Sequence, residues 1–219
     1  MEYPKGTKQN PYKGLRELRG SGVYYTGRNA VNEVQKRLDR ELLPEEKRII
    51  ELEGFVDAYY LDDKEVLTRG VGQTKKYAEG ENSLSGYNDA YQQHAKDLRA
   101  LSGMGNYDSY SPKLKQELMA SHYRGDLGQS SGFREILSSA KTQKDYEAAA
   151  KEFLNNEDYL RRLKSGGDGV TDRFKAVVDA LKNEAKYNNA DARTGASRTV
   201  EQLAQLINKP IQGGNKIID

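Results

Sequence analysis

The chain has 219 residues, of which 36% are hydrophobic, so it can form one ordinary domain with appendages or two small ones around a modest core. Its 35 Lys and Arg nearly balance its 33 Asp and Glu, which argues against an obligate nucleic-acid-binding protein. It has no Cys and only two His, which excludes a disulfide framework or a Cys-based site and argues against a Ser-His-Asp triad. We therefore expect neither a metal nor another cofactor.

The N-terminal region reads as an extended arm. Residues 1–28 are rich in Gly, Lys and Tyr and show no sustained hydrophobic period. The first residues lack the apolar stretch of a signal peptide, and no segment of the chain approaches a membrane-spanning length. A helix is expected after Asn29, which is a suitable N-cap, with one apolar stripe made of Val31, Val34, Leu38 and Leu42.

A short helix followed by a β-hairpin is predicted next. Pro44 begins the helix and Gly54 ends it, so Glu53 lies at the helix C-terminus. Phe55–Leu61 has the composition of a strand, residues 62–65 have turn character, and the extended pattern resumes at Val66-Leu67-Thr68. The hairpin is followed by the tripeptide Gly70-Val71-Gly72.

The remainder of the chain is predicted to be helical. Ser111-Pro112 is a typical helix start, because Pro is favoured at the first helical position. A polar linker is expected at 191–197, an amphipathic helix at 199–207 and an irregular tail at 210–219. The other helices are expected at 88–101, 133–140, 144–154 and 171–185. The fold class is therefore α+β, mostly α.

The hairpin region carries residue types that suit glycoside hydrolysis. That reaction needs one carboxylic acid to protonate the leaving oxygen and a second carboxylate to activate water or attack the sugar. Glu53 at a helix end, Asp62 in the hairpin turn and the Thr68 hydroxyl on the return strand supply such groups. Taken singly, each has a structural explanation: a solvated helix-end Glu, a turn Asp and an ordinary strand Thr.

The joint pattern is more specific than its members. Seven positions, Glu53, Gly54, Tyr60, Asp62, Thr68, Gly70 and Gly72, resemble in type and spacing the phage-type lysozymes, glycoside hydrolase family 24. The resemblance implies a lysozyme-like fold with a small β-hairpin lobe and a helical lobe. It implies a muramidase that cleaves the N-acetylmuramic acid to N-acetylglucosamine bond with inversion. By resemblance, Glu53 is the general acid, Asp62 positions or deprotonates the attacking water, and Thr68 helps to hold that water.

The resemblance continues more weakly downstream and covers Pro44 to Ala185. Thr171-Asp172-Arg173 resembles the family segment whose Arg faces the catalytic Glu. Arg173 is thus expected to pair with an acid near Glu53 or to bind a peptide-stem carboxylate, with a solvated Arg as the structural alternative. His122 lies where the family's central helix approaches the cleft, although a packed or solvated His is favoured over a substrate contact. The other expected substrate-binding residues are Tyr60, Gly70, Gly72 and Gln73.

The chain departs from the family pattern in three places. Gln73 stands where the family has a His that pairs with an acid on the next helix, so we expect a weaker link from Gln73 to Asp97. Glu65 replaces a turn Gly, which predicts a different turn because a left-handed conformation is strained for Glu. Leu52 replaces an acid that precedes the catalytic Glu, which leaves Arg173 without its expected partner.

Three segments are expected: a docking arm and helix at 1–43, a catalytic domain at 44–189, and a linker, short helix and tail at 190–219. The substrate is bacterial peptidoglycan. The terminal arms favour docking to other proteins of a phage virion, in the tail or ejection apparatus, with action in the bacterial periplasm.

Four alternatives stay open at this stage. An endolysin with decorated ends would perform the same reaction, whereas a silent lysozyme-fold virion protein would perform none. Nucleic-acid binding has only scattered basic pairs, Lys75-Lys76 and Arg161-Arg162, in its favour. Residue types do not separate a hydrolase from a transglycosylase, although a water-activating Asp62 favours hydrolysis.

Overall fold

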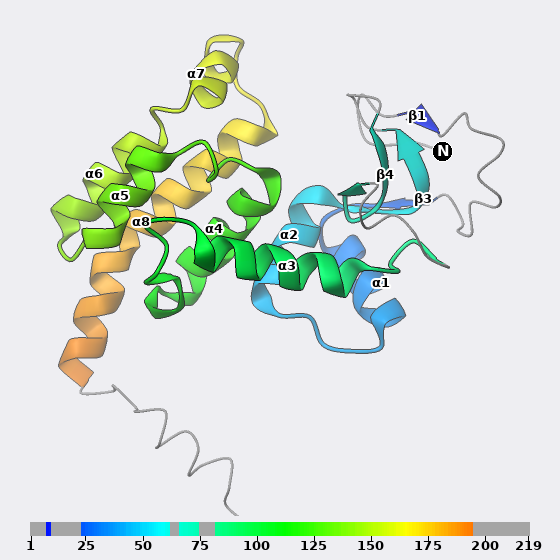
Figure 1. Cartoon of the computed structure of the whole chain (residues 1–219), viewed down its shortest axis with the longest axis horizontal. Helices are drawn as coiled ribbons and strands as arrows, with labels where there is room; N and C mark the ends of the chain where they lie inside the picture. Colours follow the sequence, from blue (N-terminus) through cyan, green and yellow to red (C-terminus); the bar gives the residue numbers. More distant parts are fainter. Residues whose placement is uncertain (1–7, 10–22, 62–65, 75–81, 195–219) are drawn as a thin grey trace, which may run out of the picture.

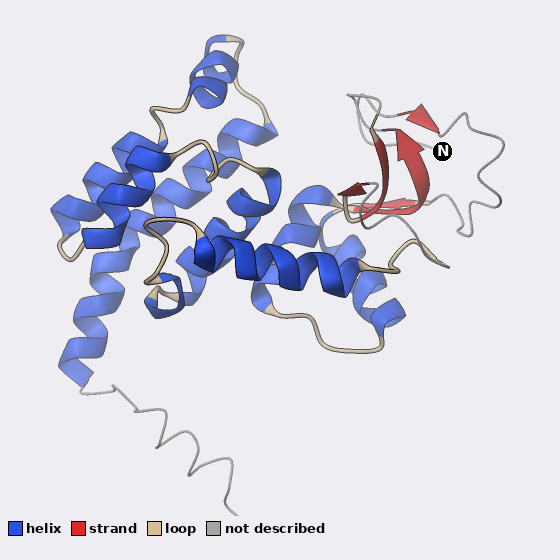
Figure 2. Cartoon of the chain, in the orientation of Figure 1, coloured by secondary structure: helices blue, strands red, loops and turns tan. Residues whose placement is uncertain are grey.

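The computed structural model describes residues 8–9, 23–61, 66–74 and 82–194. It is mostly helical with one small antiparallel sheet, which confirms the expected α+β, mostly α class. The sheet lies at one end of the molecule and the helices of the C-terminal half lie at the other end (Figures 1 and 2). Among the described helices, none combines the length and the apolar character needed to cross a membrane.

The helices largely follow the local signals in the sequence. Pro44 is the first residue of its helix and Gly54 caps the end, as predicted. Ser111 accepts a hydrogen bond from the backbone N–H of Leu114 and so caps the helix that begins at Pro112. The helices are α1 (Gly27–Leu38), α2 (Pro44–Glu53), α3 (Tyr87–Ala100), η2 (Tyr107–Ser109), α4 (Pro112–Arg124), α5 (Ser131–Ser139), α6 (Gln143–Phe153), α7 (Glu157–Lys164) and α8 (Gly169–Thr194).

Three helix expectations need correction. Helix α1 begins at Gly27 with Thr26 as its N-cap residue, not after Asn29. Helix α7 was not predicted, although Asn156 caps it through its side chain and basic residues fill its last turn. Helix α8 continues through the first part of the expected polar linker, because residues 183–194 contain neither Gly nor Pro to end it. The expected helix at 199–207 and the tail lie outside the described residues.

The sheet is built around its longest strand. Strand β3 (Phe55–Leu61) pairs on one edge with β4 (Leu67–Gly70), which in turn pairs with β5 (Gln73–Thr74). On its other edge β3 pairs with β1 (Lys8–Gln9) and β2 (Tyr24–Tyr25), and all of these pairs are antiparallel. Two pieces of the expected arm therefore belong to the sheet that carries the hairpin.

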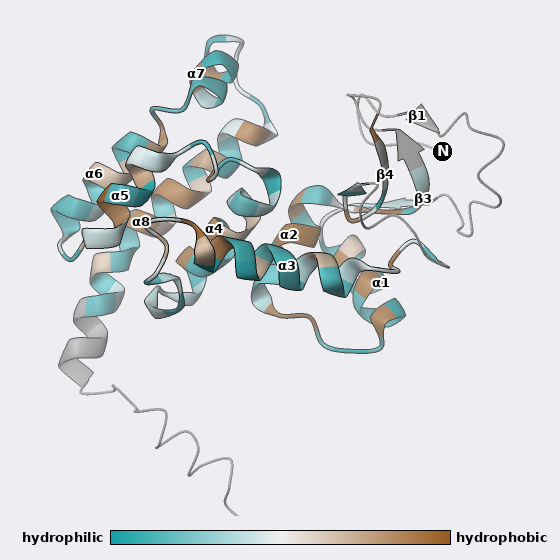
Figure 3. Cartoon of the chain, viewed as in Figure 1, coloured by the Kyte–Doolittle hydropathy of each residue, from teal (hydrophilic) through white to brown (hydrophobic). Residues whose placement is uncertain are grey.

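One core connects the C-terminus of α2 with α8. Helix α4 packs against both α2 and α8, and α8 also packs against α6. A run of aromatic rings, Phe133, Phe153 and Phe174, links α5, α6 and α8 with centroid separations of 4.7 and 4.9 Å. In Figure 3 the ribbons of α2 and α4 carry hydrophobic positions, whereas much of α3 is hydrophilic. The C-terminus of α2 and the start of α8 are thus held by one shared core.

Candidate active site

Glu53 is fixed at the junction between the helical part and the sheet. It is the last residue of α2, and the backbone N–H of Gly54 donates to the Ile50 carbonyl at 2.9 Å. Gly54 has φ 74°, a conformation that glycine adopts without the strain of a side chain. The Glu53 side chain is 28% exposed, so its carboxyl is partly shielded and still accessible from solvent.

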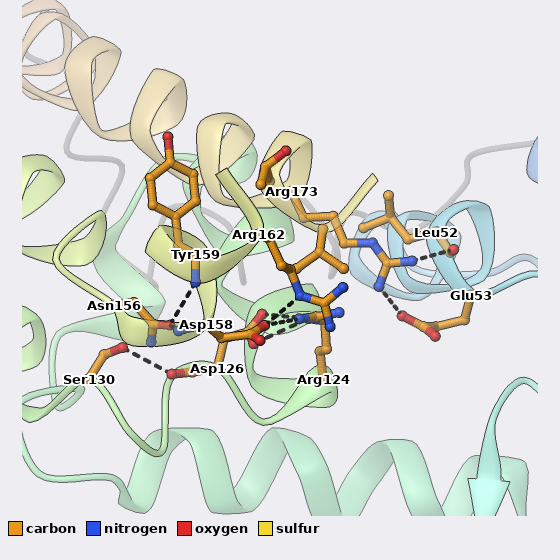
Figure 4. A network of polar contacts seen from close by, with 12 residues as sticks. Leu52, Glu53, Arg124, Asp126, Ser130, Asn156, Asp158, Tyr159, Arg162 and Arg173 are labelled. Carbon is orange, nitrogen blue, oxygen red and sulfur yellow. Dashed lines mark hydrogen bonds and ion pairs between the residues drawn. The ribbon is translucent and has the colours of Figure 1, made fainter. Parts of the chain in front are cut away.

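Arg173 reaches Glu53 from α8, 120 residues later in the chain. Its Nη1 donates to Glu53 Oε1 at 2.5 Å, and its Nη2 donates to the Leu52 carbonyl at 2.7 Å (Figure 4). Arg173, which lacks the acid expected at position 52, thus pairs with Glu53 itself and with the carbonyl of Leu52. A backbone carbonyl at a helix C-terminus has no partner within the helix and carries partial negative charge, so it attracts a cation whatever its side chain is. A stem carboxylate would have to compete with both contacts.

The hairpin is described only in part. Asp62 and Glu65 lie outside the described residues, and of Tyr60 only the backbone is described. Thr68 lies in β4 opposite Tyr60 and is 3% exposed. Its hydroxyl donates to the Val66 carbonyl at 3.0 Å, which leaves the lone pairs of its oxygen able to accept a hydrogen bond.

The Gly70 to Gln73 segment forms a tight turn between β4 and β5. Gly70 has φ 59°, and a Cβ placed on it would lie 2.3 Å from both Gln73 Oε1 and the Ser83 carbonyl oxygen. Gly72 has φ 76°, but the nearest atom to its Cβ position is Tyr123 Cε1 at 3.9 Å. Both residues adopt the left-handed conformation, which glycine tolerates. Only at Gly70 would a side chain also clash with its neighbours.

The expected link between Gln73 and Asp97 is wrong. Gln73 is 2% exposed, and its Oε1 accepts a hydrogen bond from the backbone N–H of Val71 at 2.8 Å. Asp97 instead accepts from Gln93 Nε2 at 2.6 Å, within α3. The buried Nε2 of Gln73 has no hydrogen-bond partner in the part of the chain that the structure describes. The oxygen of the Gln73 amide thus serves the turn itself, and among the described residues no bond to the neighbouring helix forms.

A network of arginines and aspartates lies beside Arg173 (Figure 4). Arg124 pairs with Asp126 at 3.0 Å and with Asp158 at 3.0 Å, and Arg162 pairs with Asp158 at 2.9 Å. Burial raises the pKa of Asp126, while the charges of Arg124 and Arg173 act against that rise. Arg161 also pairs with Asp158. These ion pairs neutralise the basic pair Arg161-Arg162, which weakens its value as a nucleic-acid contact.

The same network borders a pocket between the end of α4 and α7. The pocket has a volume of about 720 Å³, and its lining includes Arg124, Asp126, Asn156 and Arg161. Sequence reasoning missed this pocket because α7 was not predicted. Within the described residues, no three His, Asp or Glu side chains gather as a group that could hold a metal ion.

The chain has no counterpart in the comparisons made with known proteins. A scan against models of protein families matched none, and neither curated proteins nor solved structures yielded a match. The interpretation of the site therefore depends on its geometry and on the sequence motif.

His122 is packed between helices. Both of its ring nitrogens are buried, and neither has a hydrogen-bond partner among the described residues. Its ring lies edge-on to His94 with centroids 5.6 Å apart, and the His94 ring lies 4.7 Å from that of Tyr123. Tyr123 in turn donates its hydroxyl hydrogen to the Val71 carbonyl at 2.6 Å, which ties α4 to the β4–β5 turn. These contacts favour the packed interpretation of His122 over a substrate contact.

The protein is expected to lose stability in acid through His122. Burial and the neighbouring His94 lower the pKa of His122 below its ordinary value of 6.5, while Asp97 acts in the opposite direction. The unfolded chain therefore binds a proton at a higher pH than the folded protein does, so stability falls as the pH drops below 6.5 and levels off below the folded-state pKa. His122→Phe keeps a ring and removes the titration. Thermal unfolding at pH 8 and pH 5 should show a smaller decrease for the variant, and equal decreases would contradict this role.

Proposed function

We propose that this chain is a peptidoglycan hydrolase, a muramidase that cleaves the β-1,4 bond from N-acetylmuramic acid to N-acetylglucosamine. The observation that carries the proposal is the position of Glu53. It sits at the end of α2, immediately before the strand of the hairpin, and a cation from α8 contacts it. The resemblance of the Glu53 to Gly72 motif to phage-type lysozymes supports the same assignment.

In the proposed reaction Glu53 acts as the general acid. Its carboxyl proton passes to the glycosidic oxygen as the bond to the anomeric carbon breaks. Asp62, the residue that follows β3 in the sequence, accepts a proton from the water that attacks the opposite face of that carbon, which inverts its configuration. Thr68 helps to hold this water. The partial exposure of Glu53 suits this role, because the acid must meet the substrate.

The proposed setting is a phage virion, in the tail or ejection apparatus, with action on the peptidoglycan of the bacterial periplasm. Other virion proteins are the proposed partners, bound through the terminal segments. An endolysin is the alternative and would perform the same reaction, so one assay of peptidoglycan cleavage tests both. A silent structural protein with a lysozyme-like fold would release no fragments.

The proposal is tested by incubating the protein with purified peptidoglycan and identifying the released fragments by mass. Fragments with reducing ends are expected from an inverting or a retaining hydrolase, and the anomer released first distinguishes the two. Fragments with anhydro ends would assign a transglycosylase and remove the role of Asp62. An absence of fragments would favour the structural protein.

Thr68→Val is expected to lower kcat while leaving KM nearly unchanged. Valine keeps the β-branched shape that suits β4 but has no hydroxyl to hold the water. A water displaced by about 1 Å can reduce the rate by about 10²-fold. Thr68→Ser retains the hydroxyl and is the matched control, with kcat close to that of the parent protein. Equal rates for the Val and Ser variants would exclude the hydroxyl from the reaction.

A further inference from the structure

Tyr24 lies directly against the residue that follows Glu53. Strand β2 pairs with the start of β3, so that Tyr24 is opposite Val56. A Cβ placed on Gly54 would lie 2.7 Å from Tyr24 Cε2 and 3.0 Å from Tyr24 Oη. The ring of Tyr24 therefore occupies the space that any larger residue at position 54 would need, and its hydroxyl lies at the same end of α2 as the Glu53 carboxyl.

The strand that carries Tyr24 is held firmly at this place. The carbonyl of Val23 accepts a hydrogen bond from the backbone N–H of Asp57 at 3.0 Å. The ring of Tyr25 stacks on Phe55 with centroids 5.7 Å apart. Downstream, Arg37 of α1 makes two hydrogen bonds of 2.6 and 3.0 Å to the buried carboxylate of Asp57. Contacts on both sides of Tyr24 thus anchor this segment to β3.

We propose that Tyr24 is a positioning residue of the Glu53 site: its ring fixes the backbone turn after Glu53, and its hydroxyl sets the polarity around the Glu53 carboxyl. The kinetic part of this inference rests on the proposed function. The geometric part does not, because it depends only on the contact between β2 and the end of α2. The segment before α2 is then a component of the site as well as a proposed docking arm.

The electrostatic surroundings of Tyr24 agree with this position. Burial raises the pKa of Tyr24, the charge of Glu53 raises it further, and the charge of Arg173 lowers it. The charged groups that act on the hydroxyl thus come from α2 and α8, and the charge of Arg173 also acts on Asp126, in the loop after α4. Such coupling is reciprocal, so a change at Glu53 must change the titration of Tyr24.

The first experiment compares kinetics on peptidoglycan. Tyr24→Phe keeps the ring and removes the hydroxyl, Tyr24→Ala removes both, and Tyr25→Phe is the matched control on the neighbouring residue. Tyr24→Ala is expected to lower kcat by about 10²-fold with little change in KM, because the acid is no longer held in place. Tyr24→Phe should change the pH–rate profile, because the proposal gives the hydroxyl a part in setting the polarity around the Glu53 carboxyl. Tyr25→Phe should leave both unchanged. If the pH–rate profiles of Tyr24→Phe and of the parent protein coincide, the role of the hydroxyl is overturned, even if Tyr24→Ala fails to fold.

The second experiment needs no activity. The full-length protein is labelled with 13C at the tyrosine Cζ, and Tyr24→Phe identifies the Tyr24 signal. Glu53→Gln should lower the pKa of Tyr24, because the negative charge that disfavours the tyrosinate is removed, whereas Arg173→Gln should raise it. A shift without any fragment release would uphold the contact and refute the muramidase. If neither substitution changes the pKa of Tyr24, this inference is overturned, whatever the activity.

Discussion

Glu53→Gln is expected to abolish fragment release from peptidoglycan while leaving the fold intact. A positioned general acid contributes about 10²–10⁴-fold to such a rate, and an amide has no proton of suitable acidity to deliver. The amide oxygen can still accept the hydrogen bond that Arg173 Nη1 donates to Glu53, so the contact between α2 and α8 survives. Release of reducing ends is the measurement, with circular dichroism and thermal unfolding to establish the fold.

Glu51→Gln is the matched control for this experiment. Glu51 lies two residues earlier on α2, its side chain is 44% exposed, and it pairs with Arg48 at 3.8 Å. The same change of charge at this position should leave fragment release unaltered. If Glu53→Gln retains the activity of the parent, Glu53 is not the acid, and the muramidase assignment loses its main support.

Gly70→Ala is expected to destabilise the protein much more than Gly72→Ala. Both glycines have positive φ, which costs about 1–2 kcal/mol for a residue with a side chain. At Gly72 that conformational term is the whole effect, because the nearest atom to the new methyl group is 3.9 Å away. At Gly70 the methyl group would meet two oxygens at 2.3 Å, one of them from the backbone of Ser83, and such overpacking adds about 1–3 kcal/mol.

Denaturant unfolding of the two variants checks this difference directly. The free energy of unfolding should fall in both, with the larger fall for Gly70→Ala. Equal effects would mean that the turn moves aside at no cost in energy. The difference between the two variants also bears on the motif, because the resemblance implies that both glycines bind substrate. The contacts of Gly70 already give a structural reason for a glycine there, whereas a Cβ on Gly72 would lie 3.9 Å from the Tyr123 ring, which is an ordinary van der Waals distance.

The local elements around Glu53 were predictable because their signals lie within a few residues of each other. Pro44 and Gly54 mark the two ends of α2, and residues 55–61 have the composition of a strand, so the place of Glu53 at a helix end follows from the sequence. Helix α7 had a local signal too, in its Asn156 cap and its terminal charges. It was missed because eight residues give too little periodicity to recognise.

The contacts of these elements depend on tertiary structure. Strands β1 and β2 have two residues each, too few to show an alternation, and they exist only because β3 offers an unpaired edge. Gln73 accepts a hydrogen bond from the backbone N–H of Val71, and Asp97 accepts one from Gln93 of its own helix, which no pattern of residue types could indicate.

The amino-acid sequence alone was sufficient to indicate which residues lie at the end of α2 and in the hairpin, since helix caps and strand composition act over a few residues. It was not sufficient to show that Arg173 takes both Glu53 and the Leu52 carbonyl as partners, or that Tyr24 lies on Gly54. Those contacts join segments far apart in the chain. They form only when α2 and α8 pack on α4 and β2 pairs with β3, because the packing of the whole core sets these distances.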